Sequence, residues 1–334
     1  MSRTTIVDIA NALGITPSTV SRALSGSSKI KPSTRKAVVA KAAELGYERN
    51  EVASGFRRGV TNTVGIVVPL INREFFSDMI STAESVLEQA GYTVLICQTR
   101  ESEEEEKRAL ATLRASRVAG IMISHASGTE SGNAIEEILH GSKIKLLQFD
   151  RAFEGLPGST VVNDDFQAAY AAVSHLIGQG YRKIGAFTGF DSCLNFVNRY
   201  KGYLAALKDA GIKPNQSIVY KETIVRDRGY ENAKKALKAG CDAIWSSGAF
   251  SALGAIQFLK EQGIKMPEDF GVAATANESF TSLITPSLTT VDQHPKTMGK
   301  LAAEAMLRLL DNKTEGELLT VPTDLIIRDS SSRK

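Results

Sequence analysis

The chain has 334 residues, of which 43% are hydrophobic, and a formal net charge of +3. No apolar run approaches the length of a membrane span and no signal sequence opens the chain, which argues against a membrane protein and a periplasmic receptor. The cysteines Cys97, Cys193 and Cys241 lack the spacing of a disulfide or metal framework, so we expect reduced thiols in a cytoplasmic protein.

The charge is distributed unevenly along the chain. Residues 1–60 hold ten lysines and arginines against four acidic residues, a net charge of +6, whereas the remainder carries −3. A basic end attached to a slightly acidic body is typical of a nucleic-acid-binding segment joined to a separate domain.

Residues 5–13 predict a short amphipathic helix. Thr5 and Asp8 have the spacing of a capping box at its start, and Gly14 offers the positive φ of a turn at its end. The apolar side chains recur at the spacing of one helical face: Ile6, Ile9, Ala10 and Leu13.

A second helix is predicted from Pro17, with Thr16 as its N-cap. Its inward positions are Val20, Ala23 and Leu24. Its outer face carries short hydroxyl side chains and one cation: Ser18, Thr19, Ser21, Arg22 and Ser25. Such a face suits close approach to phosphates and base edges, and the alternative is an ordinary helical hairpin in a bundle.

A third helix is predicted from Pro32 through Val38, Ala42 and Leu45, and it ends at Gly46. Three helices within residues 1–47 make a minimal helix-turn-helix domain, the kind of unit that places its second helix in the major groove.

From residue 61 to 330, apolar runs alternate with amphipathic stretches. The runs predict strands at 64–68, 93–97, 118–124, 145–150, 161–162, 184–188, 217–220 and 243–246. The intervening stretches predict helices at 75–90, 102–114, 132–140, 165–179, 195–210, 228–239 and 250–262. This alternation predicts parallel sheets covered by helices, and the length favours two α/β lobes with a ligand cleft between them. We expect Glu103–Glu106 to form a solvated helix face.

Nothing in the sequence argues for catalysis. The four histidines form no metal-ligand pattern, no Ser/His/Asp arrangement stands out, and no phosphate-binding glycine motif follows a strand. We therefore predict a protein that is not an enzyme and that has neither a metal nor another cofactor.

Several segments resemble the LacI/GalR family of bacterial transcription regulators. The resemblance rests on residues 5–10, 15–24, 34–35, 44–47, 50, 53, 61–69 and 286–293, and it covers essentially the whole chain. It implies a body similar to periplasmic sugar-binding proteins, with chain crossings near residues 160, 290 and 322. Lobe 1 is then expected at about 61–160 plus 292–321, and lobe 2 at about 161–290 plus 322–330.

The resemblance also implies a hinge helix within residues 48–60 that folds in the minor groove. Phe56 stands where the family usually has Leu, and as an apolar wedge it would still kink the duplex; the alternative is that it packs the linker against the body. The expected DNA contacts are Thr5, Thr16, Pro17, Ser18, Thr19, Ser21, Arg22, Ser25, Lys29, Thr34, Asn50, Ala53, Phe56 and Arg57.

For the effector site, the resemblance implies a set of charged and aromatic side chains: Arg73, Phe75, Phe76, Asp150, Arg151, Asp165, Phe196, Arg199 and Asn277. Each has a structural alternative. Asp164 or Asp165 caps the following helix, Arg199 is an ion-pair partner, or Asp150 and Arg151 pair with each other.

Two departures from the family pattern bear on the effector. Gly248-Ala249 replaces the usual Asn-Asp, and Ala274-Thr275-Ala276 replaces Gly-Phe and a polar residue. Losing a charge-assisted hydrogen bond costs roughly 1.5–3 kcal/mol, which puts the usual sugar-binding mode in question. The effector classes left open are a sugar, a sugar phosphate and a sugar acid.

The sequence thus predicts a cytoplasmic, homodimeric regulator of transcription that binds a near-palindromic operator. A repressor of carbohydrate-metabolism genes is favoured over an activator, with an effector that changes the angle between the lobes. The alternatives are a sugar-binding protein whose head serves only dimerisation, a sugar-modifying enzyme, and a family regulator that no longer senses an effector. Inducer or co-repressor, and dimer or tetramer, stay open.

Overall fold

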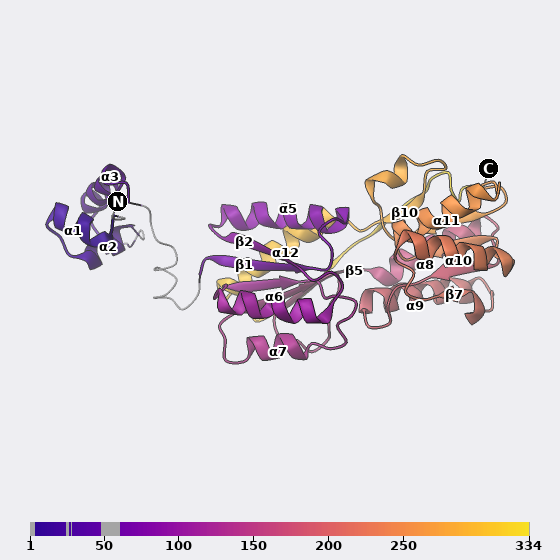
Figure 1. The fold of residues 1–334 in the computed structure, drawn as a ribbon, viewed down its shortest axis with the longest axis horizontal. Coiled ribbons are helices and arrows are strands. Elements are labelled where there is room, and N and C mark those ends of the chain that lie inside the picture. The colour runs from indigo at the N-terminus through magenta and orange to yellow at the C-terminus, as the bar shows by residue number, and fades with distance from the viewer. Residues whose placement is uncertain (1–3, 25–26, 28, 48–60, 334) are drawn as a thin grey trace. The chain divides into compact units, whose positions relative to one another are not determined.

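The computed structural model describes residues 4–24, 27, 29–47 and 61–333. They belong to two compact units, which divide the chain between Gly59 and Val60. The first unit is helical, and the second is built from sheets and helices (Figure 1).

The helical unit consists of α1 (Ile6–Leu13), α2 (Pro17–Leu24) and α3 (Pro32–Glu44). The predicted capping box is present, because the Thr5 N–H donates to Asp8 Oδ2 at 2.8 Å and the Asp8 N–H donates to Thr5 Oγ1 at 3.4 Å. Gly14 and Gly46 end their helices with φ values of 63° and 60°, as expected. All three helices contribute to one small buried core: Ile9, Ala10, Val20, Ala23, Val38 and Ala42.

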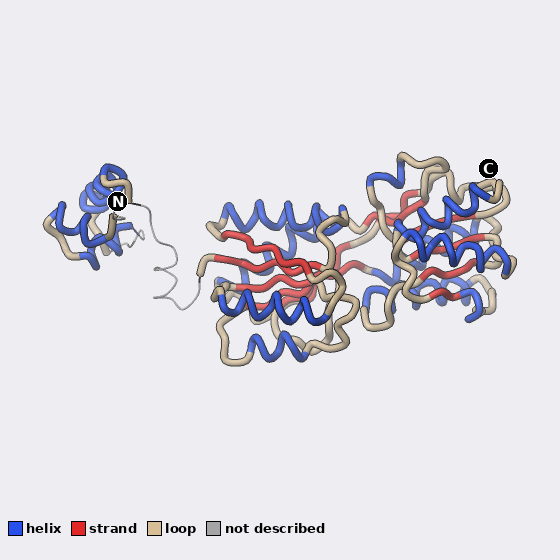
Figure 2. Tube along the Cα trace, in the orientation of Figure 1, coloured by secondary structure: helices blue, strands red, loops and turns tan. Residues whose placement is uncertain are grey.

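Lobe 1 is built on a six-stranded sheet with the order β11-β5-β4-β3-β1-β2. Its paired strands are all parallel: β1 (Thr63–Val68), β2 (Thr93–Gln98), β3 (Gly120–Ile123), β4 (Lys145–Phe149), β5 (Ser159–Asn163) and β11 (Leu318–Val321). Helices α5 (Glu74–Gln89) and α12 (Pro295–Leu310) cover one face, and α6 (Glu103–Ala115) and α7 (Asn133–Leu139) cover the other (Figure 2).

Lobe 2 has a second six-stranded sheet, with the order β12-β10-β9-β8-β6-β7. The strands are β6 (Ile184–Phe187), β7 (Val219–Tyr220), β8 (Ala243–Ser246), β9 (Gly271–Ala274), β10 (Thr289–Asp292) and β12 (Asp324–Ile326). Helices α8 (Asp165–Gly178) and α9 (Leu194–Asp209) pack on one face, and α10 (Arg226–Lys238) and α11 (Ala249–Glu261) on the other. The edge strand β12 runs antiparallel to β10, which the expectation of purely parallel sheets missed.

The chain passes between the two lobes three times. It leaves lobe 1 after β5, returns after β10 into α12, and crosses again between β11 and β12. The first crossing was expected near residue 160. The chain is still part of β5 at Asn163, which pairs with Val321 of β11, so this crossing comes after residue 163. The crossings bring the ends of strands from both sheets to the same edge, where a ligand cleft is expected.

One expectation about lobe 1 is wrong. Glu106 of α6 is only 2% exposed, and it belongs to a buried network rather than to a solvated face. Its carboxylate accepts hydrogen bonds from the Ala126 N–H at 2.7 Å and Thr129 Oγ1 at 3.1 Å, and it contacts His125 Nδ1 at 2.8 Å. These partners satisfy the buried charge of Glu106. The three glutamates before it lie in the first turn of α6 and form ion pairs with Lys107 and Arg108.

Candidate DNA-binding and effector sites

Helix α2 presents the polar face that its sequence predicts. Val20 and Ala23 are buried against the other helices, while Ser18 and Arg22 are exposed and Ser21 is half-buried. This division follows from the helical period, which turns the two apolar positions inward.

The N-terminus of α2 is organised by Thr16. Its hydroxyl lies 2.9 Å from both Ser18 Oγ and Thr19 Oγ1, and it accepts from the Thr19 N–H at 3.3 Å. The remaining N–H groups and hydroxyls at such a helix start form a favourable position for a phosphate.

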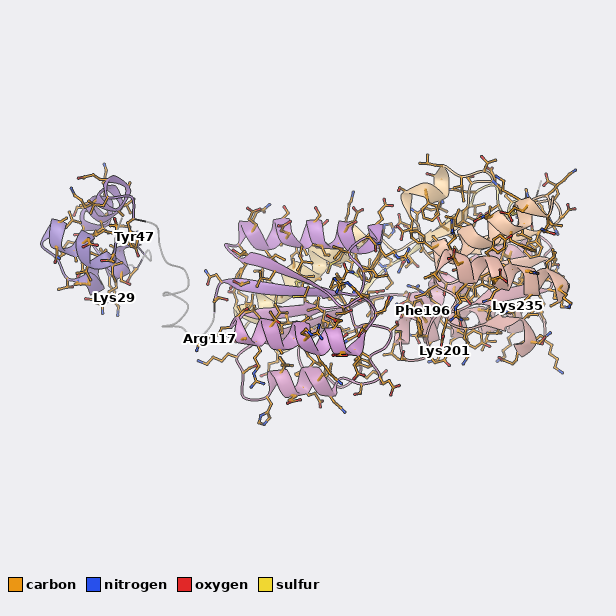
Figure 3. The ribbon with its side chains drawn as sticks, in the orientation of Figure 1. Lys29, Tyr47, Arg117, Phe196, Lys201 and Lys235 are labelled. Atoms are coloured by element: carbon orange, nitrogen blue, oxygen red, sulfur yellow. The ribbon has the colours of Figure 1, made fainter. Side chains whose placement is uncertain are left out.

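Of the other expected DNA contacts, Thr5, Pro17 and Lys29 are exposed and Thr34 is half-buried; Figure 3 labels Lys29 in the helical unit. The Thr5 hydroxyl is already engaged, because it donates to Asp8 Oδ2 at 2.8 Å. The expected hinge helix at 48–60 lies outside the described residues, as do five expected contacts: Ser25, Asn50, Ala53, Phe56 and Arg57.

Between the lobes lies a cavity of about 110 Å³, which we call the cleft cavity. Seven of the nine expected effector residues line it: Arg73, Phe75, Phe76, Asp150, Arg151, Phe196 and Arg199. Phe196, labelled in Figure 3, belongs to the first turn of α9. The other two, Asp165 and Asn277, lie outside its lining.

Arg151 is buried at the end of β4, where its main partner is Glu101. The guanidinium donates to Glu101 at 2.6 and 3.1 Å and to the His125 carbonyl at 3.3 Å. Burial lowers the pKa of the Arg151 guanidinium. The nearby Glu101 carboxylate raises it by more than burial lowers it, so the pKa is raised overall. The expected alternative, pairing with the neighbouring Asp150, is only a 3.9 Å contact.

Arg199 and Asp165 form a second buried ion pair. Arg199 Nε lies 2.7 Å from Asp165 Oδ1, and Nη1 donates to the Ser247 carbonyl at 2.9 Å. Burial raises the pKa of Asp165 to about 6 even though Arg199 opposes the shift. Asp164 is the residue that caps α8, since its Oδ1 accepts from the Gln167 N–H at 3.0 Å.

The second-lobe wall of the cleft cavity is apolar where the family pattern is polar. Gly248, Ala249 and Ala276 line it, together with Phe250. The Arg73 guanidinium lies over the Phe250 ring at 3.8 Å, a cation–π contact that joins the two lobes.

Further polar contacts hold the lobes together. Asn195 of lobe 2 donates to Asp150 of lobe 1 at 3.2 Å. The Glu74 N–H at the start of α5 donates to Glu278 Oε2 of lobe 2 at 3.2 Å. In the other direction, Glu74 Oε2 accepts at 2.6 Å from the Ser279 N–H, which begins the short 3-10 helix Ser279–Ser282 of lobe 2.

The sequence reasoning missed several lining residues: Leu70, Glu101, Asn195, Ile224, Ser247, Phe250 and Gln293. Ser247 directly follows β8, and Glu101 lies shortly after β2. Their position just beyond the carboxyl ends of strands is a signal that could have identified them.

Two buried polar atoms beside the cleft cavity, Ser247 Oγ and Arg151 Nε, have no hydrogen-bond partner among the described residues. Ser247 is 1% and Arg151 7% exposed, and Arg151 Nε lies 3.9 Å from Asp150 Oδ2. Both atoms are enclosed by the surrounding protein, so they add polar character to the wall without offering exposed surface to a ligand.

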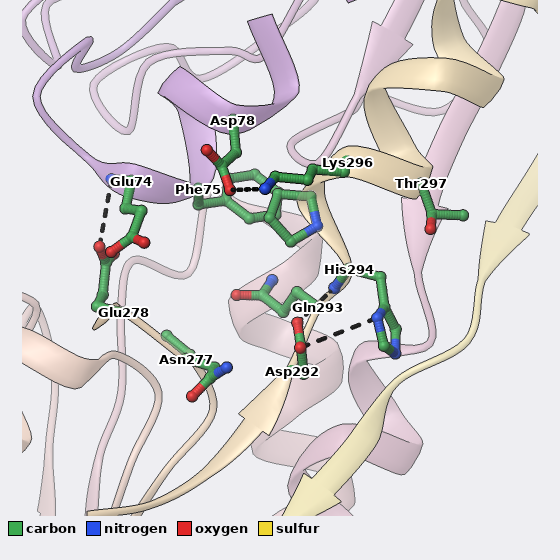
Figure 4. Close-up of a pocket in the computed structure, with 12 residues that line it drawn as sticks. Glu74, Phe75, Asp78, Asn277, Glu278, Asp292, Gln293, His294, Lys296 and Thr297 are labelled. Atoms are coloured by element: carbon green, nitrogen blue, oxygen red, sulfur yellow. Dashed lines mark hydrogen bonds and ion pairs between the residues drawn. The ribbon is translucent and has the colours of Figure 1, made fainter. Parts of the chain in front are cut away.

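A larger cavity of about 250 Å³ adjoins the first, and we call it the second chamber (Figure 4). The two share the lining residues Phe75, Ala276, Glu278 and Gln293. Asn277, expected in the effector site, lines only the second chamber, where its Oδ1 is taken up by Thr281, Thr290 and Arg328.

A helix-turn-helix unit joined to a two-lobed α/β unit with a cavity between its lobes defines a class of protein: a DNA-binding regulator with a ligand-binding body. Residues 5–50 match the model of bacterial regulatory proteins of the lacI family. Residues 61–329 match the model of periplasmic binding proteins and the sugar-binding domain of the LacI family. The chain therefore belongs to the LacI family, and it is a DNA-binding transcriptional regulator.

Curated relatives extend over nearly the whole chain. The HTH-type transcriptional regulator DegA of Bacillus subtilis (strain 168) is 30% identical over 99% of this chain and 98% of its own length. Catabolite control protein A of Priestia megaterium is 27% identical over 98% of this chain and 99% of its own. These relatives are regulators of transcription, not enzymes.

Solved structures have the same fold. A lac repressor dimer bound to operator and the anti-inducer ONPF superimposes with a TM-score of 0.84 at 23% identity, over 99% of both chains. A complex of the transcriptional regulator CelR with cellobiose gives a TM-score of 0.74 at 25% identity, over 98% of this chain and 100% of the other.

The described residues contain no group of three or more His, Cys, Asp or Glu side chains arranged to hold a metal ion. They also include no helix with the length and apolar character needed to cross a membrane.

Proposed function

We propose that this regulator is a repressor that binds a near-palindromic operator as a homodimer and responds to a small molecule in the cleft cavity. The proposed organisation is a helix-turn-helix domain at 1–47, a hinge helix at 48–60 and an effector-binding core at 61–330. The division of the chain after Gly59 and the two six-stranded sheets support it.

Base readout is assigned to the exposed face of α2, with Ser18, Ser21 and Arg22 as its main residues. Arg22 is the one cation on this face and can bind a guanine through two hydrogen bonds. The Thr16 end of α2 would bind a phosphate and set the orientation of the helix.

Comparing Arg22→Ala with Arg57→Ala tests this assignment. On an operator selected from random duplexes, Arg22→Ala should weaken binding roughly 10- to 100-fold while leaving random DNA nearly unchanged. Arg57→Ala, a proposed phosphate contact, should weaken both DNAs alike and reduce the salt dependence of binding. Equal losses on both DNAs for both variants would contradict base readout by α2, and binding that ignores salt would favour a head that only dimerises.

The cleft cavity itself carries the proposal of an effector, because it lies between the two lobes and seven of the nine expected effector residues line it. The lining offers guanidinium donors and carboxylate acceptors, the groups that form hydrogen bonds with the hydroxyls of a ligand. The Phe196 ring beside them suits the apolar face of a ring-shaped polyol.

The charges around the cleft cavity favour a neutral sugar over a sugar phosphate or sugar acid. Arg151 is neutralised by Glu101 and Arg199 by Asp165. The remaining cation, Arg73, interacts electrostatically with Glu278 and Glu101, and Asp150 adds a further carboxylate to the lining. No cation of the described lining is left in excess for a phosphate group.

Thermal unfolding against glucose, glucose 6-phosphate and gluconate, as representatives of the three classes, tests the effector class. A ligand at 100 times its Kd should stabilise by about 2.7 kcal/mol, or on the order of 5–10 °C for a body of this size. We expect the neutral class to act, and Phe196→Ala to abolish most of the shift while the exposed Ser77→Ala retains it. A shift only with the charged compounds would contradict the neutral assignment, and no shift with any class would favour a regulator that no longer senses an effector.

A further inference from the structure

Glu106, His125 and Gln148 form a buried chain of hydrogen-bonding side chains in lobe 1. They belong to α6, to the loop after β3 and to β4, and each is at most 2% exposed. His125 Nδ1 lies 2.8 Å from Glu106 Oε1, and His125 Nε2 lies 3.1 Å from Gln148 Oε1. The imidazole therefore has a side-chain oxygen at each of its ring nitrogens.

The backbone of Phe153 determines the orientation of the Gln148 amide. The Phe153 N–H donates to Gln148 Oε1 at 2.8 Å, and Gln148 Nε2 donates to the Phe153 carbonyl at 3.1 Å. The opposite orientation would place two donors against each other, and likewise two acceptors. The atom that faces His125 Nε2 is thus an acceptor, so this ring nitrogen carries a proton.

The other ring nitrogen faces the Glu106 carboxyl. Glu106 Oε2 already accepts from the Ala126 N–H at 2.7 Å and from Thr129 Oγ1 at 3.1 Å, and hydrogen bonds of this kind favour the ionised carboxylate. Imidazole is also the more basic of the two groups in water. The proton between Glu106 and His125 Nδ1 therefore belongs to the ring, and a ring with protons on both nitrogens is an imidazolium.

The surroundings of the ring are compatible with a positive charge. The centroid of the Phe153 ring lies 4.6 Å from that of His125, within the range of a cation–π contact. The other charged groups around this loop are Arg151, Glu101 and Asp150. Arg151 is paired with Glu101 at 2.6 Å, and Asp150 is a carboxylate that accepts from a hydroxyl of the loop at 3.3 Å. None of these three residues adds an uncompensated positive charge.

The loop that contains His125, residues 124–129, connects this buried pair to the cleft cavity. The His125 carbonyl accepts from Arg151 Nη1 at 3.3 Å, and the Ser127 N–H donates to Glu101 Oε2 at 2.8 Å. Glu101 and Arg151 both line the cleft cavity, whereas His125 is not part of its lining. The position of the loop therefore determines where the backbone groups lie that hold this ion pair of the cavity.

We propose that Glu106 and Gln148 hold His125 as an imidazolium, and that the charged pair His125–Glu106 positions the 124–129 loop beneath the ion pair of the cleft cavity. His125 and Glu106 are positioning residues, because they act on the cavity through the loop. The charge on the ring and the position of the loop do not depend on the proposed function. Only the consequence for effector binding rests on it.

Nitrogen NMR of the full chain with ¹⁵N-labelled histidine tests the charge directly. At pH 7, we expect both ring nitrogens of His125 to carry protons and to show the chemical shifts of an imidazolium. Replacing each of the other three histidines with glutamine in turn assigns the signals, and these side chains are exposed or half-buried. A His125 ring with a single protonated nitrogen would overturn the proposal.

Glu106→Gln separates the charge of the pair from its hydrogen bonds. The amide oxygen would accept from Ala126 and Thr129, and the amide NH₂ would donate to an unprotonated Nδ1, so we expect a folded variant with a neutral His125. Its folded state then binds one proton fewer than that of the wild type. The melting temperature of the wild type should therefore fall relative to the variant by roughly 5 °C from pH 6 to pH 8. Parallel pH profiles would contradict an imidazolium.

Hydrogen exchange of residues 124–129 tests the positioning role. Glu106→Gln should retain the protection of the Ser127 amide, whereas Glu106→Ala should accelerate its exchange about tenfold or more. Glu104→Ala is the matched control, because Glu104 belongs to the same helix but its side chain is 83% exposed. Equal exchange in the two alanine variants would contradict the positioning role. If Glu106→Ala fails to fold, Thr129→Val removes one donor to the carboxylate and should accelerate exchange severalfold.

Thermal unfolding with glucose separates this proposal from the proposed function. At pH 7, Glu106→Ala should reduce the shift that glucose produces, and Glu106→Gln should retain it. If glucose fails to stabilise the wild type while His125 carries two ring protons, the neutral effector falls and the positioning pair stands. A singly protonated ring in a chain that glucose does stabilise would remove the pair and leave the effector site.

Discussion

At the scale of single residues, the most consequential group is the carboxyl of Asp165. It lies in full burial beside Arg199, and burial raises its pKa from an ordinary 3.8 to about 6. Between these two values the folded chain binds more protons at Asp165 than the unfolded chain does. The stability that Asp165 contributes is therefore greatest at low pH and falls as the pH rises toward 6.

Asp165→Asn should remove this pH dependence. Lowering the pH from 7 to 5 should raise the free energy of unfolding of the wild-type chain by roughly 1 kcal/mol relative to the variant, because only the wild type gains from protonation. Urea unfolding of both proteins at the two pH values measures the difference. Parallel changes in the two proteins would show that Asp165 does not titrate in this range.

At the scale of elements, lobe 2 depends on the close packing of α10 against α11. A Cβ on Gly254 would lie 1.9 Å from the Arg226 carbonyl oxygen, and one on Gly229 would lie 2.0 Å from the Ser251 carbonyl oxygen. The two helix backbones therefore approach each other where neither carries a side chain. Because α11 begins at the cavity wall with Ala249 and Phe250, this packing also positions the cleft.

Gly254→Ala should destabilise the chain by several kcal/mol, since the added methyl meets rigid backbone rather than a movable side chain. Gly178→Ala is the control, because Gly178 is also helical, as the last residue of α8, and is not among the positive-φ glycines, but a Cβ there has open space around it. That control should be neutral or stabilise by about 0.5–1 kcal/mol. Thermal unfolding compares the two, and similar melting temperatures would contradict the packing argument.

At the scale of the whole molecule, the proposed homodimer requires a surface that a monomer would leave exposed. The edge strand β2 offers one: its only neighbour in the described sheet is β1, and Leu95 and Ile96 are 41% and 50% exposed. Exposed apolar side chains on an unpaired sheet edge mark an interaction surface.

Ile96→Lys should therefore shift the protein from dimer to monomer in light scattering and weaken operator binding at least tenfold, because a monomer reaches one half-site at a time. Ile327→Lys places the same charge at a position that is 54% exposed in lobe 2 and should leave the dimer intact. A dimer that survives Ile96→Lys, or one that both variants disrupt, would exclude β2 as the specific contact.

The sequence by itself determined the local structure of this protein and the class to which it belongs. The capping box, the turn glycines and the apolar stripe of α1 are short-range features, and each is present as predicted. The alternation of strands and helices up to α11 followed from hydrophobic periodicity in the same way, whereas β9, β10, α12, β11 and β12 were not among the predicted elements. Seven cleft residues were also predictable from the resemblance to the family: five follow strands β1 and β4, and Phe196 and Arg199 belong to α9.

The tertiary structure alone decided which charges meet. Glu106 looks like the three glutamates before it in sequence, yet it alone is fully buried, and His125 and Thr129 reach it from a loop distant in sequence. Asp164 and Asp165 are adjacent residues of the same type. Asp164 caps α8, whereas Asp165 forms an ion pair, and this difference depends on Arg199 of α9. Secondary structure depends on neighbours a few residues away, whereas the state of a charge depends on groups that are far apart in sequence and close together only after folding.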